Sequence, residues 1–126
     1  MDQHGLIFQN RDELLCIDVN RIFYIKSDGN YSQIYTNTNL KLPTQVGTNL
    51  AGIEVELDRF FRHKKHTFAR LSKKYIINLD YVYRISIPRK LLIMTDFEHV
   101  VYTITDVPAE RLKALKDIVT ELKYKK

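Results

Sequence analysis

The residues of this chain best suited to binding chemistry are two adjacent lysines, Lys73 and Lys74, which follow Ser72. They separate two apolar runs, 68–71 and 75–79, whose aromatic and β-branched residues are typical of strands joined by a tight turn. Because an unpaired ammonium group is costly to bury, both lysines should point toward solvent or toward an anion. Lysine donates hydrogen bonds to phosphate oxygens and to the O6 and N7 atoms of guanine. We therefore interpret this turn as a candidate nucleic-acid contact, against the alternative of an ordinary solvated turn.

Three further polar segments could form loop tips on the predicted strands. They lie near positions 26–31, 88–90 and 105–106. Loops on rigid strands commonly carry binding residues, and asparagine can read the edge of adenine. The full set of predicted nucleic-acid contacts is Lys73, Lys74, Ser72, Asn30, Tyr31, Lys26, Arg89, Lys90 and Thr105. Each tip is also compatible with a solvated turn, and for the pair Asp28-Gly29 we favour that interpretation.

The charge balance favours an acidic partner. The 126-residue chain has a net charge of +5, which fits nucleic acid or anionic lipid. Residues 59–75 form the most basic stretch and contain no aspartate or glutamate. Lys64 and Lys65 within this stretch are further candidate phosphate contacts, although a solvated surface explains a run of charge equally well.

Other kinds of chemistry find little support in the sequence. His63 and His66 are three residues apart, but no cysteine or second histidine pair joins them, so we predict no metal site. None of the four glycines precedes a Lys-Ser/Thr pair at the spacing of a phosphate-binding loop, and no paired carboxylates stand out at a strand end. We therefore expect neither a cofactor nor an enzymatic activity.

The single cysteine, Cys16, lies in the apolar run 14–17 and has no second cysteine for an internal disulfide. We predict a buried structural thiol rather than a nucleophile. A chain without disulfides fits a reducing compartment. No apolar stretch approaches the roughly 20 residues of a membrane span, and the N-terminus lacks the pattern of a signal peptide. We therefore expect a cytoplasmic protein without a membrane partner.

Short strands must position the candidate contacts, because turn signals recur at close intervals along the chain. We predict about nine to ten strands, at 5–9, 14–17, 22–25, 31–36, 40–46, 68–71, 75–79, 81–87, 91–95 and 100–104. Sequential hairpins favour antiparallel sheets. Thr48 is the expected N-cap of an internal helix over 48–60, and Thr105, Asp106 and Pro108 mark the start of a C-terminal helix. The length predicts a single domain over 1–126.

Two segments in this order resemble the LytTR-type DNA-binding domain, an output module of bacterial response regulators in two-component systems. The first is 22–31, a strand followed by Gly-Asn-Tyr, and the second is 68–79, similar to the family's Phe-x-Arg-x-His-Arg-Ser-Tyr-x-Val-Asn motif. The resemblance covers about 15–122. It implies a mainly β, elongated arrangement of short antiparallel sheets. It also implies a transcriptional regulator that binds double-stranded DNA sequence-specifically, with loops entering successive major grooves.

The chain departs from the family pattern at the turn itself. Ser72, Lys73 and Lys74 take the places of the family's His, Arg and Ser, so the base preference is not transferable. Thr105-Asp106 stands where the family often has Ser-Arg. An acid there would oppose phosphate, and we expect Asp106 to cap the helix instead.

The resemblance also implies partners. These are double-stranded DNA, a second copy of the chain on repeated half-sites, and a receiver domain or sensor kinase system in trans. Two alternatives stay open at this point. The same fold could serve as a protein-interaction or sensory module with weakened DNA readout, or it could bind single-stranded nucleic acid through Tyr31, Tyr35 and their basic neighbours.

Overall fold

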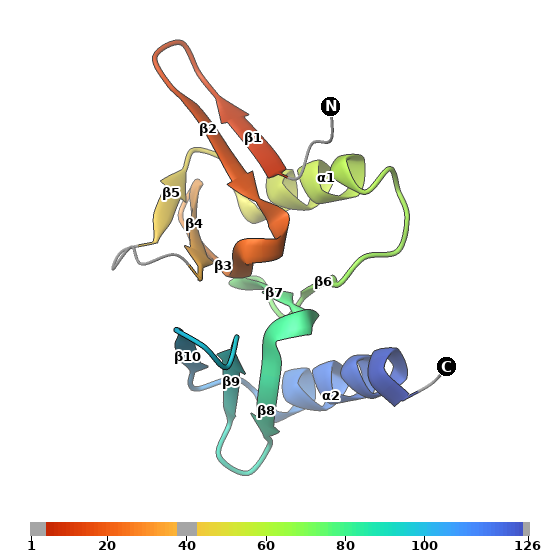
Figure 1. Cartoon of the computed structure of the whole chain (residues 1–126). Helices are drawn as coiled ribbons and strands as arrows, with labels where there is room; N and C mark the ends of the chain where they lie inside the picture. Colours follow the sequence, from red (N-terminus) through yellow and green to blue (C-terminus); the bar gives the residue numbers. More distant parts are fainter. Residues whose placement is uncertain (1–4, 38–42, 125–126) are drawn as a thin grey trace. The chain divides into compact units, whose positions relative to one another are not determined.

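The computed structural model describes residues 5–37 and 43–124. Within these residues the chain forms ten strands in three antiparallel sheets, together with two α-helices, which confirms the predicted mainly β class (Figure 1). The chain divides into two compact units, Met1–Ile77 and Asn78–Lys126, which are described separately. The expectation of a single domain stays a prediction. Neither helix in the described ranges has the length and hydropathy needed to span a membrane.

The first unit contains a two-stranded sheet, a five-stranded sheet, one α-helix and η1, a single 3-10 turn (Val19–Arg21). The small sheet pairs β1 with β2, and the larger has the order β5-β4-β3-β7-β6. The elements are β1 (Gly5–Gln9), β2 (Leu14–Asp18), β3 (Ile22–Asp28), β4 (Tyr31–Thr36), β5 (Thr44–Val46), α1 (Leu50–Phe60), β6 (Phe68–Arg70) and β7 (Tyr75–Asn78).

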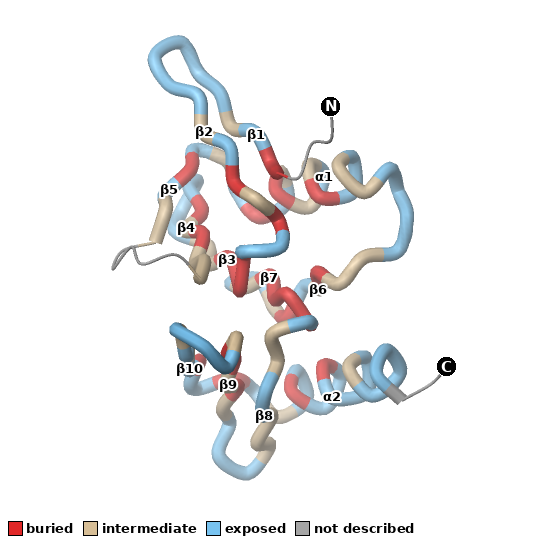
Figure 2. The backbone as a smooth tube through the Cα atoms, viewed as in Figure 1, coloured by how far each residue is buried: buried red, intermediate tan, exposed pale blue. Residues whose placement is uncertain are grey.

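The core of the first unit lies between α1 and one face of the five-stranded sheet. Ile25 on β3 pairs in register with Ile34 on β4 and with Ile76 on β7, so these three side chains form a row on the same face. The helix presents Ile53 and Leu57 to the same hydrophobic cluster, and all five residues are buried. Figure 2 colours buried stretches of α1 and of the sheet red. Leu50, Ile53 and Leu57, the buried residues of α1, follow one another at spacings of three and four, as on one face of an amphipathic helix.

Strand β3 runs longer than the predicted strand at 22–25. It continues to Asp28, because Lys26, Ser27 and Asp28 pair with Gln33, Ser32 and Tyr31 across the hairpin. Backbone ladders form irrespective of side-chain polarity, so a polar run does not end a strand when a partner strand is available. The remaining turn is short, and Gly29 supplies the positive φ of 63° that such turns require.

The internal helix begins at Leu50 rather than at 48. Its N-cap is Asn49, whose side-chain oxygen accepts the backbone N–H of Gly52 over 2.9 Å, so the prediction of Thr48 as the cap was wrong. Asparagine is among the best N-cap residues, and it outcompetes the adjacent threonine here. The predicted strand at 40–46 is seen as β5, and positions 38–42 lie outside the described residues.

Cys16 is exposed, so the predicted burial of its thiol was wrong. Strand β2 alternates between faces, and Cys16 lies on the same side as Leu14, which is also exposed. Leu15 and Ile17 point the other way and are half-buried and buried, respectively. A two-stranded hairpin has only one face against the core, so an apolar run on it cannot be buried on both sides.

The second unit consists of a three-stranded antiparallel sheet of order β10-β9-β8 and a long helix. Its elements are η2, a single 3-10 turn (Leu79–Tyr81), β8 (Val82–Ser86), β9 (Leu91–Thr95), β10 (Val101–Ile104) and α2 (Ala109–Tyr124). Buried apolar side chains come from β9 and β10 and from one stripe of α2, which includes Leu112 and Leu115.

The C-terminal helix begins at Ala109, later than predicted. The carbonyl of Pro108 accepts the N–H of Leu112 over 3.2 Å, so neither Thr105 nor Asp106 occupies the capping position. The residue before a proline is disfavoured in the helical region, which prevents the helix from starting upstream of Pro108. The expectation that Asp106 caps the helix is therefore wrong.

Candidate nucleic-acid interface

The turn that carries the two lysines connects β6 to β7. The N–H of Leu71 donates to the carbonyl of Tyr75 over 2.9 Å and closes the turn at its base. Within the turn, the hydroxyl oxygen of Ser72 accepts the N–H of Lys74 over 3.1 Å. This local side-chain to backbone bond fixes the turn without a glycine or proline. The side chains of Lys73 and Lys74 are exposed, as predicted for a contact loop.

The same turn is joined to the neighbouring strand β3. The N–H of Ser27 donates to the carbonyl of Lys74 over 2.8 Å, and Lys26 pairs in register with Tyr75. Lys26 is therefore half-buried on a strand beside the turn instead of lying in a loop. The structure thus brings Lys26, Lys73 and Lys74, which are far apart in sequence, to one end of the β3–β7 pair. We call these three residues the lysine cluster.

Asn30 and Tyr31 lie at the hairpin turn that follows β3. Both are exposed, and Tyr31 begins strand β4 opposite Asp28. The carboxylate of Asp28 accepts a hydrogen bond from the side-chain amide of Gln33 over 3.1 Å. This bond gives the Asp28 carboxylate a partner within the hairpin.

The remaining predicted contacts come together in the second unit. The N–H of Val107 donates to the carbonyl of Lys90 over 3.1 Å, which brings the turn between β8 and β9 next to the segment before α2. Arg89 and Lys90 from the turn, and Thr105 from the segment, are all exposed. Two tips that are separate in the sequence therefore form one surface, which we call the Lys90 surface. The carboxylate of Asp106 is exposed beside it.

The cations of these two surfaces differ from other basic side chains in their ion pairing. Among the described residues, Lys26, Lys73, Lys74, Arg89 and Lys90 form no ion pair. Other basic side chains do: Arg59 pairs with Glu56 at 3.1 Å, and Arg70 pairs with Glu54. A cation without a fixed counter-charge is available to a phosphate, because binding does not first require a salt bridge to break.

The basic segment after α1 is exposed and tightly turned. Arg62 and His63 have positive φ angles of 55° and 61°, and Lys64 and Lys65 follow them with exposed side chains. His66 instead lies against the helix, where its Nε2 is 3.1 Å from an Asp58 carboxylate oxygen. No group of three or more potential metal ligands occurs in the described part of the chain.

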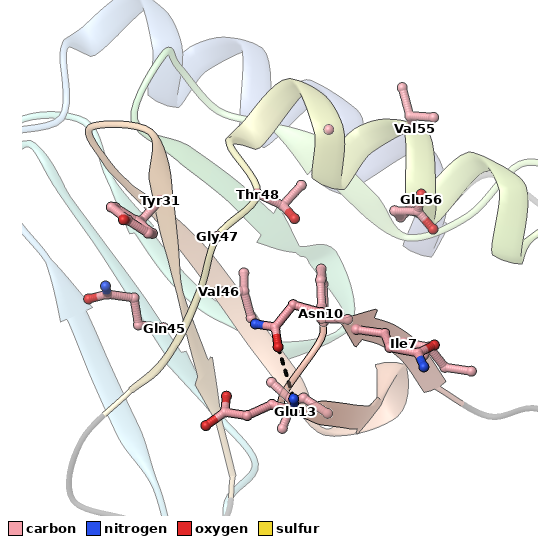
Figure 3. A pocket seen from close by; sticks show the side chains of 14 residues that line it. Ile7, Asn10, Glu13, Tyr31, Gln45, Val46, Gly47, Thr48, Val55 and Glu56 are labelled. Carbon is pink, nitrogen blue, oxygen red and sulfur yellow. Dashed lines mark hydrogen bonds between the residues drawn. The ribbon is translucent and has the colours of Figure 1, made fainter.

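A groove of about 710 Å³ opens between the β1–β2 hairpin, the end of β5 and the start of α1 (Figure 3). Its described lining contains Glu13 and Glu56 but no lysine or arginine. This charge makes the groove unsuited to phosphate. Tyr31 stands at its wall, as Figure 3 shows. Of the predicted contacts, Tyr31 is thus the one that also lines an acidic, partly apolar groove.

Two residues with a structural part in the lysine turn were missed by sequence reasoning. Ser27 acts through its backbone N–H, which no side-chain pattern reveals. Glu54 lies on α1 next to the buried Ile53 and reaches Arg70, sixteen residues away. No local spacing rule connects residues at that separation, so only the folded arrangement identifies the pair.

Comparison with known proteins supplies the family. The sequence model of the LytTr DNA-binding domain matches residues 12–120. Among solved structures, the chain is similar to one described as the LytTr DNA-binding domain of a methyl-accepting/DNA response regulator from Bacillus cereus. The TM-score is 0.56 at 11% sequence identity, over 91% of this chain and 98% of that one. No curated protein matches the chain. Since the match to the family spans most of the sequence, this chain belongs to the LytTr DNA-binding domain family.

Proposed function

We propose that the chain binds double-stranded DNA sequence-specifically and acts as the output domain of a transcriptional regulator. Membership of a family of DNA-binding domains supports the DNA-binding part of this proposal. The observation that supports it most is the lysine cluster, whose three cations lie at one end of a β-sheet and form no ion pair with any acidic residue that the structure describes.

Within this proposal, Lys73 and Lys74 enter a major groove or lie over it. They stand on a turn fixed at its base and by the Ser72 hydroxyl, so little conformational entropy is lost when they bind. An ammonium group at this position can donate to guanine O6 or N7 or to phosphate. Ser72 can also donate through its hydroxyl hydrogen while it accepts from Lys74. Asn30, and Tyr31 with it, contact a neighbouring groove or its phosphates.

The Lys90 surface supplies further contacts in the second unit. Arg89 and Lys90 bind phosphates, and Thr105 donates to a base or a phosphate. Asp106 repels phosphate at close range, so the DNA backbone approaches the arginine and lysine side of this surface. Lys64 and Lys65 add phosphate contacts in the first unit. The partners proposed beyond DNA are a second copy on repeated half-sites and a receiver domain or sensor kinase system.

The experiment compares two double variants on duplexes selected from a random pool. Lys73→Ala with Lys74→Ala should weaken binding and reduce the slope of log affinity against log salt by up to about 2, at roughly 0.9 for each phosphate contact. Lys113→Ala with Lys116→Ala makes the same charge change on the exposed side of α2 and should have a much smaller effect. Equal losses in both double variants would show that net charge, and not the turn, governs binding.

Two alternatives predict other results. Single-stranded binding would need free aromatic ring faces on which bases can stack. The rings of Tyr24 and Tyr35 instead stack on each other, with their centroids 4.2 Å apart and an interplanar angle of 8°. Each therefore has one ring face covered by the other. Competition between a selected duplex and its separate strands tests this directly. A protein-interaction module would bind no duplex, selected or random, even at low salt.

A further inference from the structure

Arg70 connects the lysine turn to helix α1. It is the last residue of β6, two positions before Ser72. Its Nε donates to the carbonyl oxygen of Ser72 over 2.8 Å, and its Nη1 donates to a carboxylate oxygen of Glu54 on α1. One guanidinium thus bonds the backbone of the turn and a side chain of the helix at once. The planar, fixed fork of donors makes this double contact specific to arginine.

These bonds form a continuous chain from the helix to the lysines. Glu54 orients Arg70, Arg70 holds the Ser72 carbonyl, and the Ser72 hydroxyl accepts the N–H of Lys74. The opposite side of the turn is fixed by the Ser27 bond to Lys74. The turn is therefore restrained from the sheet and from the helix, although it contains neither glycine nor proline.

We propose that Glu54 is a positioning residue for DNA binding, acting through Arg70 on the Lys73–Lys74 turn. This inference rests on the proposed function of that turn. Restraining a binding loop in its bound conformation raises affinity, because less entropy is lost on association. Glu54 itself touches no DNA in this scheme, and it carries the wrong charge to do so.

The direction of the change in DNA affinity distinguishes a positioning role of Glu54 from a simple electrostatic effect of its charge. Removing a carboxylate raises the net positive charge, and by charge alone it should strengthen binding to DNA. Loss of a positioning residue should weaken binding instead. The chain offers a matched control in Glu56, which lies on the same helix and forms an i,i+3 ion pair with Arg59. Both glutamates are half-buried, so each change to alanine removes one carboxylate from a similar environment.

The test measures duplex affinity at several salt concentrations for Glu54→Ala and Glu56→Ala. We expect Glu54→Ala to weaken binding about two- to five-fold, the range set by a partly exposed ion pair. Glu56→Ala should leave the affinity unchanged or raise it slightly. Unchanged or tighter binding by Glu54→Ala would overturn the inference, and so would an equal loss in both variants.

A second variant guards against an effect of helix stability alone. Arg70→Lys keeps the charge but loses the fork, so it should weaken binding with an unchanged salt slope. Hydrogen exchange at the Lys74 amide should accelerate in Arg70→Lys and Glu54→Ala but not in Glu56→Ala. Exchange is read without DNA, so it tests the restraint separately from the proposed function. If the lysine double variant binds as well as the parent, the proposed function of the turn fails, whatever the exchange shows. Unchanged exchange at Lys74 overturns the positioning role.

Discussion

The N–H of Ser27 donates to the carbonyl of Lys74 over 2.8 Å, one position beyond the register pair of Lys26 and Tyr75. This bond extends the ladder between β3 and β7 into the turn. The lysine turn is therefore a continuation of the sheet and not a free loop. Within the turn, the Ser72 side chain accepts the N–H of Lys74. Replacing Ser72 therefore measures how much this hydrogen bond contributes to the stability of the protein.

Ser72→Ala should destabilise the protein by about 0.5–1.5 kcal/mol, because the Lys74 N–H loses its acceptor. Urea unfolding of the two forms measures the difference. Ser86→Ala is a suitable control, since Ser86 is likewise half-buried, although it lies at the end of β8 and not in a turn. A loss from Ser86→Ala as large as that from Ser72→Ala would contradict a specific role for the Ser72 hydroxyl.

Asn49→Ala should cost about 1 kcal/mol of unfolding free energy, within the usual range of about 0.5–2 for an N-cap. The reason is the loss of the acceptor for the Gly52 N–H. The neighbouring change Thr48→Ala should cost less, because the Thr48 side chain does not occupy the cap position. Thermal or urea unfolding of both variants decides between them, and a larger cost at Thr48 would restore that residue as the cap.

Where a local pattern was complete, sequence reasoning found the elements. The alternating run at Tyr31–Thr36 and the apolar run at Leu91–Thr95 were predicted to the residue. Their ends coincide with turn residues, which a sequence displays directly. The end of β3 was missed, because its polar residues continue a ladder that only the partner strand specifies.

The candidate site was predictable as residue types but not as an arrangement. The lysine turn stood out because two cations interrupt apolar strands. The lysine turn lies next to Lys26, and Lys90 lies next to the segment before α2. Both arrangements depend on backbone hydrogen bonds between residues that are distant in sequence. Tertiary packing decides such bonds, and single-sequence periodicity carries no information about them. The burial of Cys16 was mispredicted for the same reason, since the number of covered faces is a property of the whole sheet.

The Cys16 thiol should react with a disulfide reagent in the native protein at nearly the rate seen in the unfolded chain. Its side chain is exposed on β2, so no opening of the fold is needed for access. Stopped-flow measurements with and without denaturant give the two rates. Native-state protection of a hundred-fold or more would show that this face of the hairpin is covered in solution.

Asp96 should make the stability depend on pH in the acid range. Its carboxylate accepts the backbone N–H groups of His99, Glu98 and Val100, at 2.9, 3.0 and 3.1 Å. These bonds, that from His99 foremost, hold the pKa of Asp96 below its ordinary value of 3.8, while burial acts in the opposite direction. The carboxylate also organises the turn in which Phe97 has a positive φ of 62°.

The direction in which stability changes with pH follows from the lowered pKa of Asp96. The folded state favours the charged form, so the stabilisation is fully present above the unfolded pKa and is lost as pH falls through the lower folded pKa. Asp96→Ala should therefore reduce the unfolding free energy most above about pH 5, and the difference from the parent should shrink below about pH 4. Urea unfolding across this range measures it, with Asp117→Ala, on the exposed side of α2, as the control for an equal charge change. A difference that stays constant with pH would show that the turn is held without the ionised carboxylate.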